Sequence, residues 1–213
     1  MQHELILASA SPRRREILEL MDLPFTVETA AADEAAVTAS YLARETGYPG
    51  FGQLAGELVQ ALAEAKAEAV LRKKPEAANQ VVLAADTVVV LDRSILGKPI
   101  SKAEAQEMLE RLCGRVHQVY TGVSIRSGER SESFHAVSEV EFYGLDGFAR
   151  TWISRYIAGG SPFDKAGGYG IQDQGALFVK GIRGDFFNVM GLPLAETARR
   201  LESFLGNREK HEG

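Results

Sequence analysis

The segment Val81-Val-Leu-Ala-Ala-Asp-Thr-Val-Val-Val-Leu-Asp92 gives the clearest indication of the fold class. It is almost continuously apolar and rich in valine, which is typical of a strand buried on both faces of a sheet. One charged residue, Asp86, interrupts the apolar run. Burying an unpaired carboxylate is strongly unfavourable, so Asp86 is either a structural residue with a partner or a functional residue that binds a metal or a water.

The N-terminal residues predict a second short strand that leads directly into a helix. Residues 4–8 form the strand, Ser11 is the expected helix N-cap and Pro12 occupies the first helical position. The junction reads Ser9-Ala-Ser-Pro-Arg-Arg14. Hydroxyls, guanidiniums and the electropositive end of a helix suit a polyphosphate. The alternative is an ordinary helix cap with solvated arginines.

The remaining elements follow from hydrophobic periodicity and turn residues. Apolar residues recur at helical spacing from Leu54 to Ala69, and this helix carries Lys66. We expect further β structure at 25–30, a long surface excursion at 31–52, helices at 101–114, 146–158 and 193–204, and strands at 116–126, 131–143 and 176–182. Ser101 with Glu104 predicts a capping box, and Asp146 an N-cap. The order predicts an α/β chain with a mixed, twisted sheet flanked by helices.

Two further loops hold polar residues that could contact a ligand. Lys98 lies between Gly97 and Pro99, and the segment Asp164–Gly175, DKAGGYGIQDQG, is dense in glycine. Glycines permit unusual backbone angles and close approach to a ligand, and Gln172 offers both a donor and an acceptor that could read a base edge. A surface lysine and a plain glycine-rich turn are the alternatives.

Composition excludes several classes of protein. The chain has 213 residues and a net charge of −5, which argues against wholesale coating of nucleic acid. Its single cysteine, Cys113, cannot form an internal disulfide, which fits a reducing compartment. There is no GxxxxGK[ST] loop, zinc-ligand spacing or long apolar run. We therefore expect a cytoplasmic protein with no membrane or nucleic-acid partner.

Taken together, the motifs resemble one family. In order, they are SASPRR, the acidic pair Asp33 and Glu34, Lys66, ADTVV, GKP, HQVYTGV, DKAGGYGIQ and NVMGLPL. This order, from Leu5 to about Leu201, resembles the Maf family of nucleoside triphosphate pyrophosphatases, once described as septum formation inhibitors. The motif ADTVV, with the arginine of SPRR and the glutamine of GIQ, is similar to the branch that acts on dTTP and UTP.

The resemblance implies an architecture and a reaction. The architecture is elongated and two-lobed, as in the inosine triphosphate pyrophosphatases (the Maf/Ham type), with a cleft between the lobes and frequent homodimers. Residues 1–205 would be a single catalytic domain and residues 206–213 a polar tail. The reaction is hydrolysis of a nucleoside triphosphate to the monophosphate and pyrophosphate with a divalent metal, Mg²⁺ or Mn²⁺.

The resemblance also assigns roles to residues of this sequence. Asp86 would be the general base or a metal-linked carboxylate, and Glu34 a second metal ligand, with Asp33 as the alternative acid. Phosphate and substrate contacts would come from a set of polar residues, namely Ser9, Arg13, Arg14, Lys66, Lys98, Lys165 and Gln172. Base selection would fall to Arg13, Thr87 and Gln172.

Two other functions remain open from the sequence. The same chemistry could act on another base, such as that of 7-methyl-GTP. The chain could also be a non-catalytic, nucleotide-binding regulator of cell division. Two acids facing anionic phosphates make sense only with a metal between them, which favours the enzyme.

Overall fold

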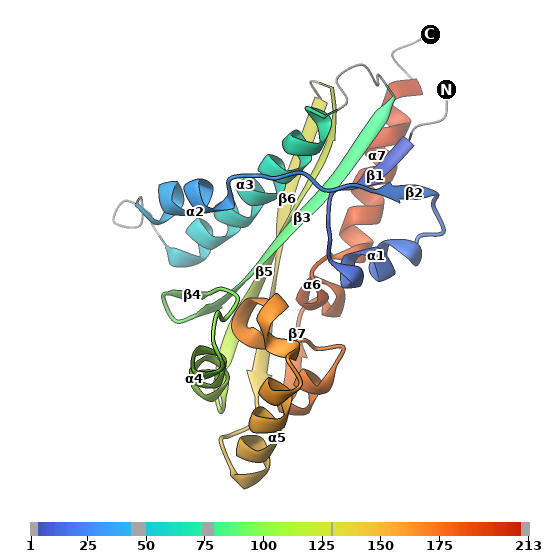
Figure 1. Ribbon diagram of the computed structural model, residues 1–213. Helices are drawn as coiled ribbons and strands as arrows, with labels where there is room; N and C mark the ends of the chain where they lie inside the picture. The colour runs from blue at the N-terminus through green and yellow to red at the C-terminus, as the bar shows by residue number, and fades with distance from the viewer. Residues whose placement is uncertain (1–3, 44–49, 74–78, 129, 210–213) are drawn as a thin grey trace. The chain divides into compact units, whose positions relative to one another are not determined.

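The computed structural model describes residues 4–43, 50–73, 79–128 and 130–209. In this part of the chain, seven strands form one sheet in the order β2-β1-β3-β5-β6-β7, with β4 paired to β3 (Figure 1). The strands are β1 (Glu4–Leu7), β2 (Phe25–Val27), β3 (Gln80–Leu91), β4 (Ser94–Leu96), β5 (Val116–Ser127), β6 (Arg130–Phe142) and β7 (Val179–Arg183). The helices are α1 (Pro12–Glu19), α2 (Glu34–Leu42), α3 (Phe51–Leu71), α4 (Lys102–Leu112), α5 (Gly147–Ala158), α6 (Phe186–Met190) and α7 (Leu194–Glu209).

The sheet is mixed, and this confirms the predicted α/β class. Strand β1 pairs in parallel with both β2 and β3, so that Leu5 lies opposite Phe25 on one side and Val81 on the other. Strand β3 pairs antiparallel with β4, and β6 pairs antiparallel with β7. Among the described residues, no helix combines the length and the apolar character that a membrane crossing requires.

The chain divides into two compact units. The first unit comprises Met1–Asp86, Thr121–Ala136 and Gly191–Gly213, and the second comprises Thr87–Tyr120 and Val137–Met190. The strands β3, β5 and β6 contribute residues to both units.

In the first unit, α3 packs on the parallel strands. Ala67 and Val70 of this helix join a buried cluster with Ile6 of β1 and with Val82 and Ala84 of β3. Small residues on the helix allow its backbone to lie close to the sheet, and the alternate residues of β3 point toward it. This packing places the later half of α3 over the centre of β3.

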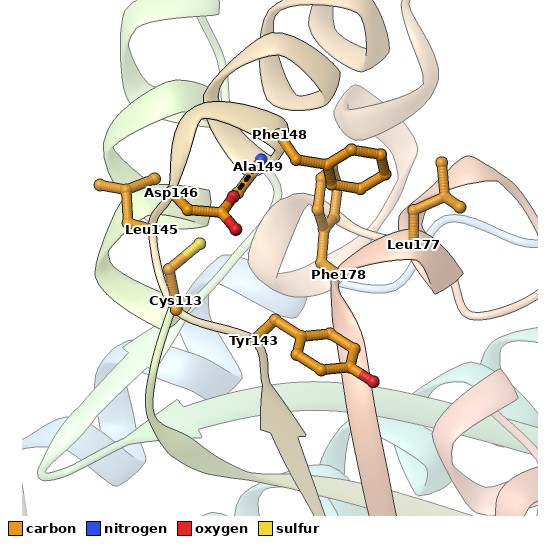
Figure 2. A pocket seen from close by; sticks show the side chains of 9 residues that line it. Cys113, Tyr143, Leu145, Asp146, Phe148, Ala149, Leu177 and Phe178 are labelled. Atoms are coloured by element: carbon orange, nitrogen blue, oxygen red, sulfur yellow. Dashed lines mark hydrogen bonds between the residues drawn. The ribbon is translucent and has the colours of Figure 1, made fainter.

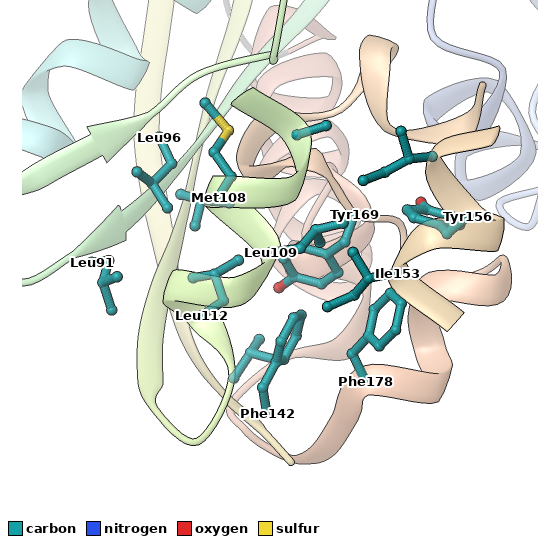
Figure 3. Packing of buried hydrophobic residues seen from close by; sticks show 14 of the residues in the cluster. Leu91, Leu96, Met108, Leu109, Leu112, Phe142, Ile153, Tyr156, Tyr169 and Phe178 are labelled. Atoms are coloured by element: carbon teal, nitrogen blue, oxygen red, sulfur yellow. The ribbon is translucent and has the colours of Figure 1, made fainter. Parts of the chain in front are cut away.

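In the second unit, a larger core joins α4, α5 and the neighbouring strands. Figure 3 shows Leu109 of α4, Phe142 of β6 and Ile153 of α5 packed with aromatic side chains. Among these aromatic residues, Tyr169 comes from the glycine-rich loop itself. The loop is therefore anchored in the core of this unit.

Helix caps follow the predicted pattern at two of three places. Ser101 Oγ accepts a hydrogen bond from Glu104 N (3.1 Å), and Asp146 Oδ1 accepts one from Ala149 N (2.8 Å). Ser11 is the N-cap of α1 and Pro12 follows it, but the Ser11 side chain makes no capping bond.

Three segments differ from the sequence expectation. The excursion at 31–52 contains α2 and the first residues of α3, because its many alanines favour helix; its residues 44–49 lie outside the described part. The strand expected at 176–182 begins only at Val179, after a 3₁₀ turn at Gln174–Phe178. Helix α7 continues to Glu209, so the first residues of the expected polar tail are helical.

Candidate active site

The carboxylate of Asp86 is paired with the ammonium of Lys66. Asp86 lies within β3, and Lys66 lies in the later half of α3, beside the residues that pack on this strand. Lys66 Nζ donates a hydrogen bond to Asp86 Oδ1. Only 14% of the Asp86 side chain and 17% of the Lys66 side chain are exposed. The ion pair explains how a carboxylate is tolerated inside an apolar strand, because an unpaired charge there would be strongly unfavourable.

Glu34 contacts the same ammonium. Its Oε1 lies 3.3 Å from Lys66 Nζ, and 54% of its side chain is exposed. Two carboxylates from different elements therefore contact the Lys66 ammonium. Asp86 comes from β3, and Glu34 comes from the first turn of α2. The buried acid is held in place by the protein, while the exposed acid faces solvent.

The adjacent acid, Asp33, has a different task. It is the N-cap of α2, and its Oδ1 accepts a hydrogen bond from Ala36 N (2.9 Å). A carboxylate at this position satisfies an amide that has no partner within the helix and is stabilised by the helix dipole. Of the two acids left open by the sequence, Glu34 is the one that reaches Lys66.

The donor set of Glu34 and Asp86 fits a hard divalent cation that shares its ligands with a substrate. Magnesium in nucleotide enzymes is commonly held by one or two carboxylates together with substrate phosphates and waters. Within the described ranges, no group of three or more His, Cys, Asp or Glu side chains could hold an ion. Glu34 and Asp86 are the two oxygen-bearing side chains here that could take part in holding such an ion.

Arg14 joins the start of α1 to the segment before α7. Its Nε donates to the carbonyl oxygen of Gly191 (2.8 Å), and its Nη1 lies 3.5 Å from Ser9 Oγ. Burial lowers the pKa of the Arg14 guanidinium from its usual value, while the negative charge of Asp86 acts in the opposite direction. Arginine stays charged throughout the physiological range. A fixed positive charge thus lies within electrostatic reach of Asp86 and Glu34.

Ser9 and Arg13 complete the group around the first turn of α1. The Ser9 hydroxyl is buried and accepts a hydrogen bond from Ser11 N (3.2 Å). Arg13 is half-buried, and its charge is close enough to lower the pKa of Arg14. The first amides of any helix lack partners within it, so this turn combines backbone donors with two guanidiniums. The predicted residues Ser9, Arg13, Arg14, Glu34, Lys66 and Asp86 all belong to the first unit.

The remaining predicted residues belong to the second unit. The backbone amide of Gly167 donates to the carbonyl oxygen of Gly97 (2.9 Å), so the GKP segment and the glycine-rich loop lie in contact. Lys98 and Gln172 are exposed on these two segments, and Thr87 is half-buried in β3. The structure thus brings together the two loops that the sequence marked separately.

Lys165 is engaged within its own loop. Its Nζ donates to the carbonyl oxygen of Ser161 (2.6 Å) and to Asp164 Oδ1 (2.6 Å), and lies 3.3 Å from Asp173 Oδ2. Only 10% of the side chain is exposed. These contacts tie the ammonium to neighbouring protein oxygens.

Sequence reasoning missed two residues of this loop's support, Tyr156 and Asp173. The Tyr156 hydroxyl contacts both oxygens of Asp173, at 3.0 and 3.2 Å. Tyr156 falls at a core position of a periodic helix, so the pattern showed an apolar residue and not a hydrogen-bond donor. Asp173, next to Gln172, was a detectable signal because a turn carboxylate commonly binds local amides.

A separate pocket of about 480 Å³ lies in the second unit (Figure 2). It is lined by Cys113, Tyr143, Gly144, Leu145, Asp146, Phe148, Ala149, Leu177 and Phe178, and so by none of the predicted site residues. Burial raises the pKa of the Cys113 thiol above its usual value. A protonated thiol is a poor nucleophile, so Cys113, which packs against the core of this unit, is more apt to fill space than to react.

The sequence was compared with known protein families and with curated proteins. A family described as "Maf: Maf-like protein" matches residues 4–204. A Bacillus mycoides protein named dTTP/UTP pyrophosphatase is 44% identical over 201 residues, which cover 94% of this chain and 95% of the relative. Proteins of the same name from Bacillus pumilus and Bacillus velezensis are each 46% identical, covering 95% and 96% of this chain and 97% and 98% of their own lengths.

The match spans the whole candidate site. Residues 4–204 include the first turn of α1, the acid of α2, the lysine of α3, the aspartate of β3 and the glycine-rich loop. The curated relatives are more than 40% identical over nearly the full length of both chains. The chain therefore belongs to the Maf family.

Proposed function

We propose that this protein hydrolyses dTTP and UTP to the nucleoside monophosphate and pyrophosphate. The observation that carries the proposal is the convergence of Glu34 and Asp86 on Lys66, with the charge of Arg14 within electrostatic reach. Acids and cations held together in this way suit a reaction that activates water next to a polyphosphate. The relatives named dTTP/UTP pyrophosphatases support the choice of substrate.

In this proposal Asp86 holds the attacking water and accepts its proton. The strand fixes the carboxylate, and the contact with Lys66 restricts its orientation. A positioned base of this kind lowers the barrier for attack at the α-phosphorus. Lys66, held beside Asp86 and Glu34, would contribute its positive charge to the phosphates.

Glu34 and Asp86 would hold a divalent cation, Mg²⁺ or Mn²⁺. Such an ion supplies charge neutralisation of the phosphates and makes a bound water more acidic. The protein's part is to present one fixed carboxylate and one solvent-facing carboxylate at the same place. The short side chain of Asp86 sets the position, while the longer side chain of Glu34 can adjust to the bound nucleotide.

Further roles follow from the character of each residue. Ser9 and Arg13, at the first turn of α1, and the exposed Lys98 would bind phosphate oxygens. Thr87 and Gln172 would act in base selection, together with Arg13. The exposed Gln172 amide has the donor and acceptor that a pyrimidine edge requires.

A triphosphate panel tests this function. The intact protein is incubated with dTTP, UTP, dCTP, GTP and 7-methyl-GTP, with and without Mg²⁺ or Mn²⁺, and pyrophosphate and orthophosphate are measured separately. We expect metal-dependent pyrophosphate release that is fastest with dTTP and UTP. Preference for 7-methyl-GTP would reassign the base, and nucleotide binding without turnover would support the regulator of cell division instead.

We propose that the enzyme works in the cytoplasm, as a homodimer. The cytoplasm supplies nucleoside triphosphates and is reducing, which suits the free thiol of Cys113. The homodimer rests on the resemblance of the sequence to the Maf family. Sedimentation of the purified protein tests the oligomeric state.

A further inference from the structure

The segment that carries Gln172 is held by one hydroxyl and one carboxylate. The Tyr156 hydroxyl, from α5, donates to Asp173 and accepts a hydrogen bond from Gly170 N (3.0 Å). Asp173 Oδ1 in turn accepts a hydrogen bond from Gly175 N (2.8 Å). The fixed points at Gly170 and at Asp173 lie on either side of Gln172 in the chain, so the backbone of this residue has little freedom.

This support comes from the interior of the second unit. Only 1% of Tyr156 is exposed, and burial raises the pKa of its hydroxyl far above the usual value. The hydroxyl therefore remains protonated and able to donate. Lys165 Nζ, 3.3 Å from Asp173 Oδ2, balances the carboxylate from its other side. The hydroxyl of Tyr156 and the ammonium of Lys165 are both largely buried and both contact Asp173, whose side chain is one-third exposed.

Two glycines of the loop lie closely packed against the same side chains and against backbone. A Cβ on Gly170 would lie 2.7 Å from Lys165 Cε and 2.9 Å from Asp173 Oδ2. A Cβ on Gly175 would lie 2.6 Å from the carbonyl oxygen of Gly170. All three distances are shorter than a normal contact of a Cβ atom, so a side chain at Gly170 would displace Lys165 and Asp173, and one at Gly175 would collide with backbone. At these two positions, glycine serves the close packing of the loop.

Tyr169, the residue directly before Gly170, anchors the same loop in the core. It is buried, with its ring 4.8 Å from that of Phe142 and 5.4 Å from that of His117, both edge to face. Its hydroxyl lies 2.7 Å from His117 Nε2. Figure 3 shows Tyr169 and Tyr156 projecting into the same apolar cluster. The backbone leading to Gln172 is thus held by two tyrosines of one rigid core.

We propose that Tyr156, Asp173 and Lys165 form a clamp, the Tyr156 clamp, whose function is to position Gln172 and thereby set the base selectivity of the enzyme. This inference rests on the proposed function. It assigns Tyr156 and Asp173 as positioning residues, and it replaces direct substrate binding by Lys165 with a role in holding the loop.

The conservative variant Tyr156→Phe removes the hydroxyl and keeps the packing. We expect the ratio of kcat/KM for dTTP to that for GTP to fall about fivefold, the effect of one net hydrogen bond. The double variant Tyr156→Phe with Gln172→Ala should have the same dTTP to GTP ratio as Gln172→Ala alone. The reason is that the clamp acts only through Gln172. Tyr143→Phe, at an exposed tyrosine of the same unit, is the matched control. An unchanged ratio, or losses that add in the double variant, would overturn the proposal.

Lys165→Met separates positioning from substrate binding. A positioning role predicts a lower dTTP to GTP ratio, as in Tyr156→Phe. Direct phosphate binding instead predicts that KM rises by the same factor for every triphosphate, so that the dTTP to GTP ratio of kcat/KM is unchanged. This result would remove Lys165 from the clamp.

Amide hydrogen exchange tests the clamp without any substrate. The Gly170 and Gly175 amides should exchange faster in Tyr156→Phe and at the normal rate in Tyr143→Phe. Equal exchange in all three proteins would overturn the clamp whatever the enzyme hydrolyses. If the wild-type protein releases no pyrophosphate from any triphosphate, the proposed function fails, while the exchange result still decides whether the clamp exists.

Discussion

The ammonium of Lys66 on α3 donates a hydrogen bond to the carboxylate of Asp86 on β3, and both side chains are largely buried. Removing one partner of such a pair leaves an uncompensated charge. We therefore predict that Lys66→Met lowers the free energy of unfolding by about 3 kcal/mol. Adding Asp86→Asn to that variant should recover most of the loss. Urea unfolding monitored by circular dichroism measures both changes; a single variant as stable as the wild type would show that the pair is not coupled.

Asp86→Asn alone tests the catalytic role of the carboxylate. Asparagine keeps the size of the side chain but cannot accept a proton, so kcat should fall by about 10²-fold or more. Asp92→Asn, at the exposed end of the same apolar run, serves as the control and should keep normal turnover. Turnover close to normal in Asp86→Asn would reassign Asp86 to structure.

The two neighbouring acids of α2 should respond differently. Glu34→Gln replaces a charged carboxylate ligand with a neutral amide, so the Mg²⁺ concentration for half-maximal activity should rise about tenfold. Asp33→Ala removes the N-cap and should instead lower stability by about 1 kcal/mol. Metal titrations and unfolding curves of both variants give the comparison. A reversed pattern, with Asp33 controlling the metal response, would exchange the two assignments.

The buried His117 predicts a pH dependence of stability. Burial lowers its pKa from 6.5 to about 4, so the folded protein holds the ring neutral where the unfolded chain is already protonated. The contribution of His117 is fully present above pH 6.5 and is lost as the pH falls toward 4. One pKa unit corresponds to about 1.4 kcal/mol, so the loss amounts to about 3 kcal/mol.

A variant without the imidazole isolates this contribution from the carboxylates that titrate nearby. His117→Asn should show a flatter decline of unfolding free energy between pH 6.5 and 4 than the wild type. Parallel curves for the two proteins would contradict the pKa assignment. The comparison is valid at constant ionic strength, since surface charges also change over this interval.

The sequence predicts an element of the fold correctly wherever its residues favour one type of secondary structure clearly. The valine-rich run around Asp86 predicted a buried strand, and Ser101 and Asp146 predicted helix caps that the structure confirms. The secondary structure of residues 31–52 is harder to predict, because the alanines of this segment favour helix while its glycines and threonines favour loops. The expected strand at 176–182 began late because the Asp173 side chain binds the amide of a local turn.

For the candidate site, the sequence supplied residue types but not their partners. Linear order places Lys66 twenty residues before Asp86 and gives no sign that the two side chains meet. Likewise, hydrophobic periodicity predicts that Tyr156 is buried but says nothing of what its hydroxyl contacts. Pairings between elements depend on tertiary packing, which a one-dimensional pattern does not contain.

In the proposed reaction, water attacks the α-phosphorus with the help of Asp86. The most direct measurement is hydrolysis of dTTP in water enriched in ¹⁸O, followed by mass analysis of both products. Attack at the α-phosphorus predicts that the label enters the nucleoside monophosphate and that the pyrophosphate stays unlabelled. Labelled pyrophosphate, or orthophosphate with a nucleoside diphosphate as the first products, would contradict the account.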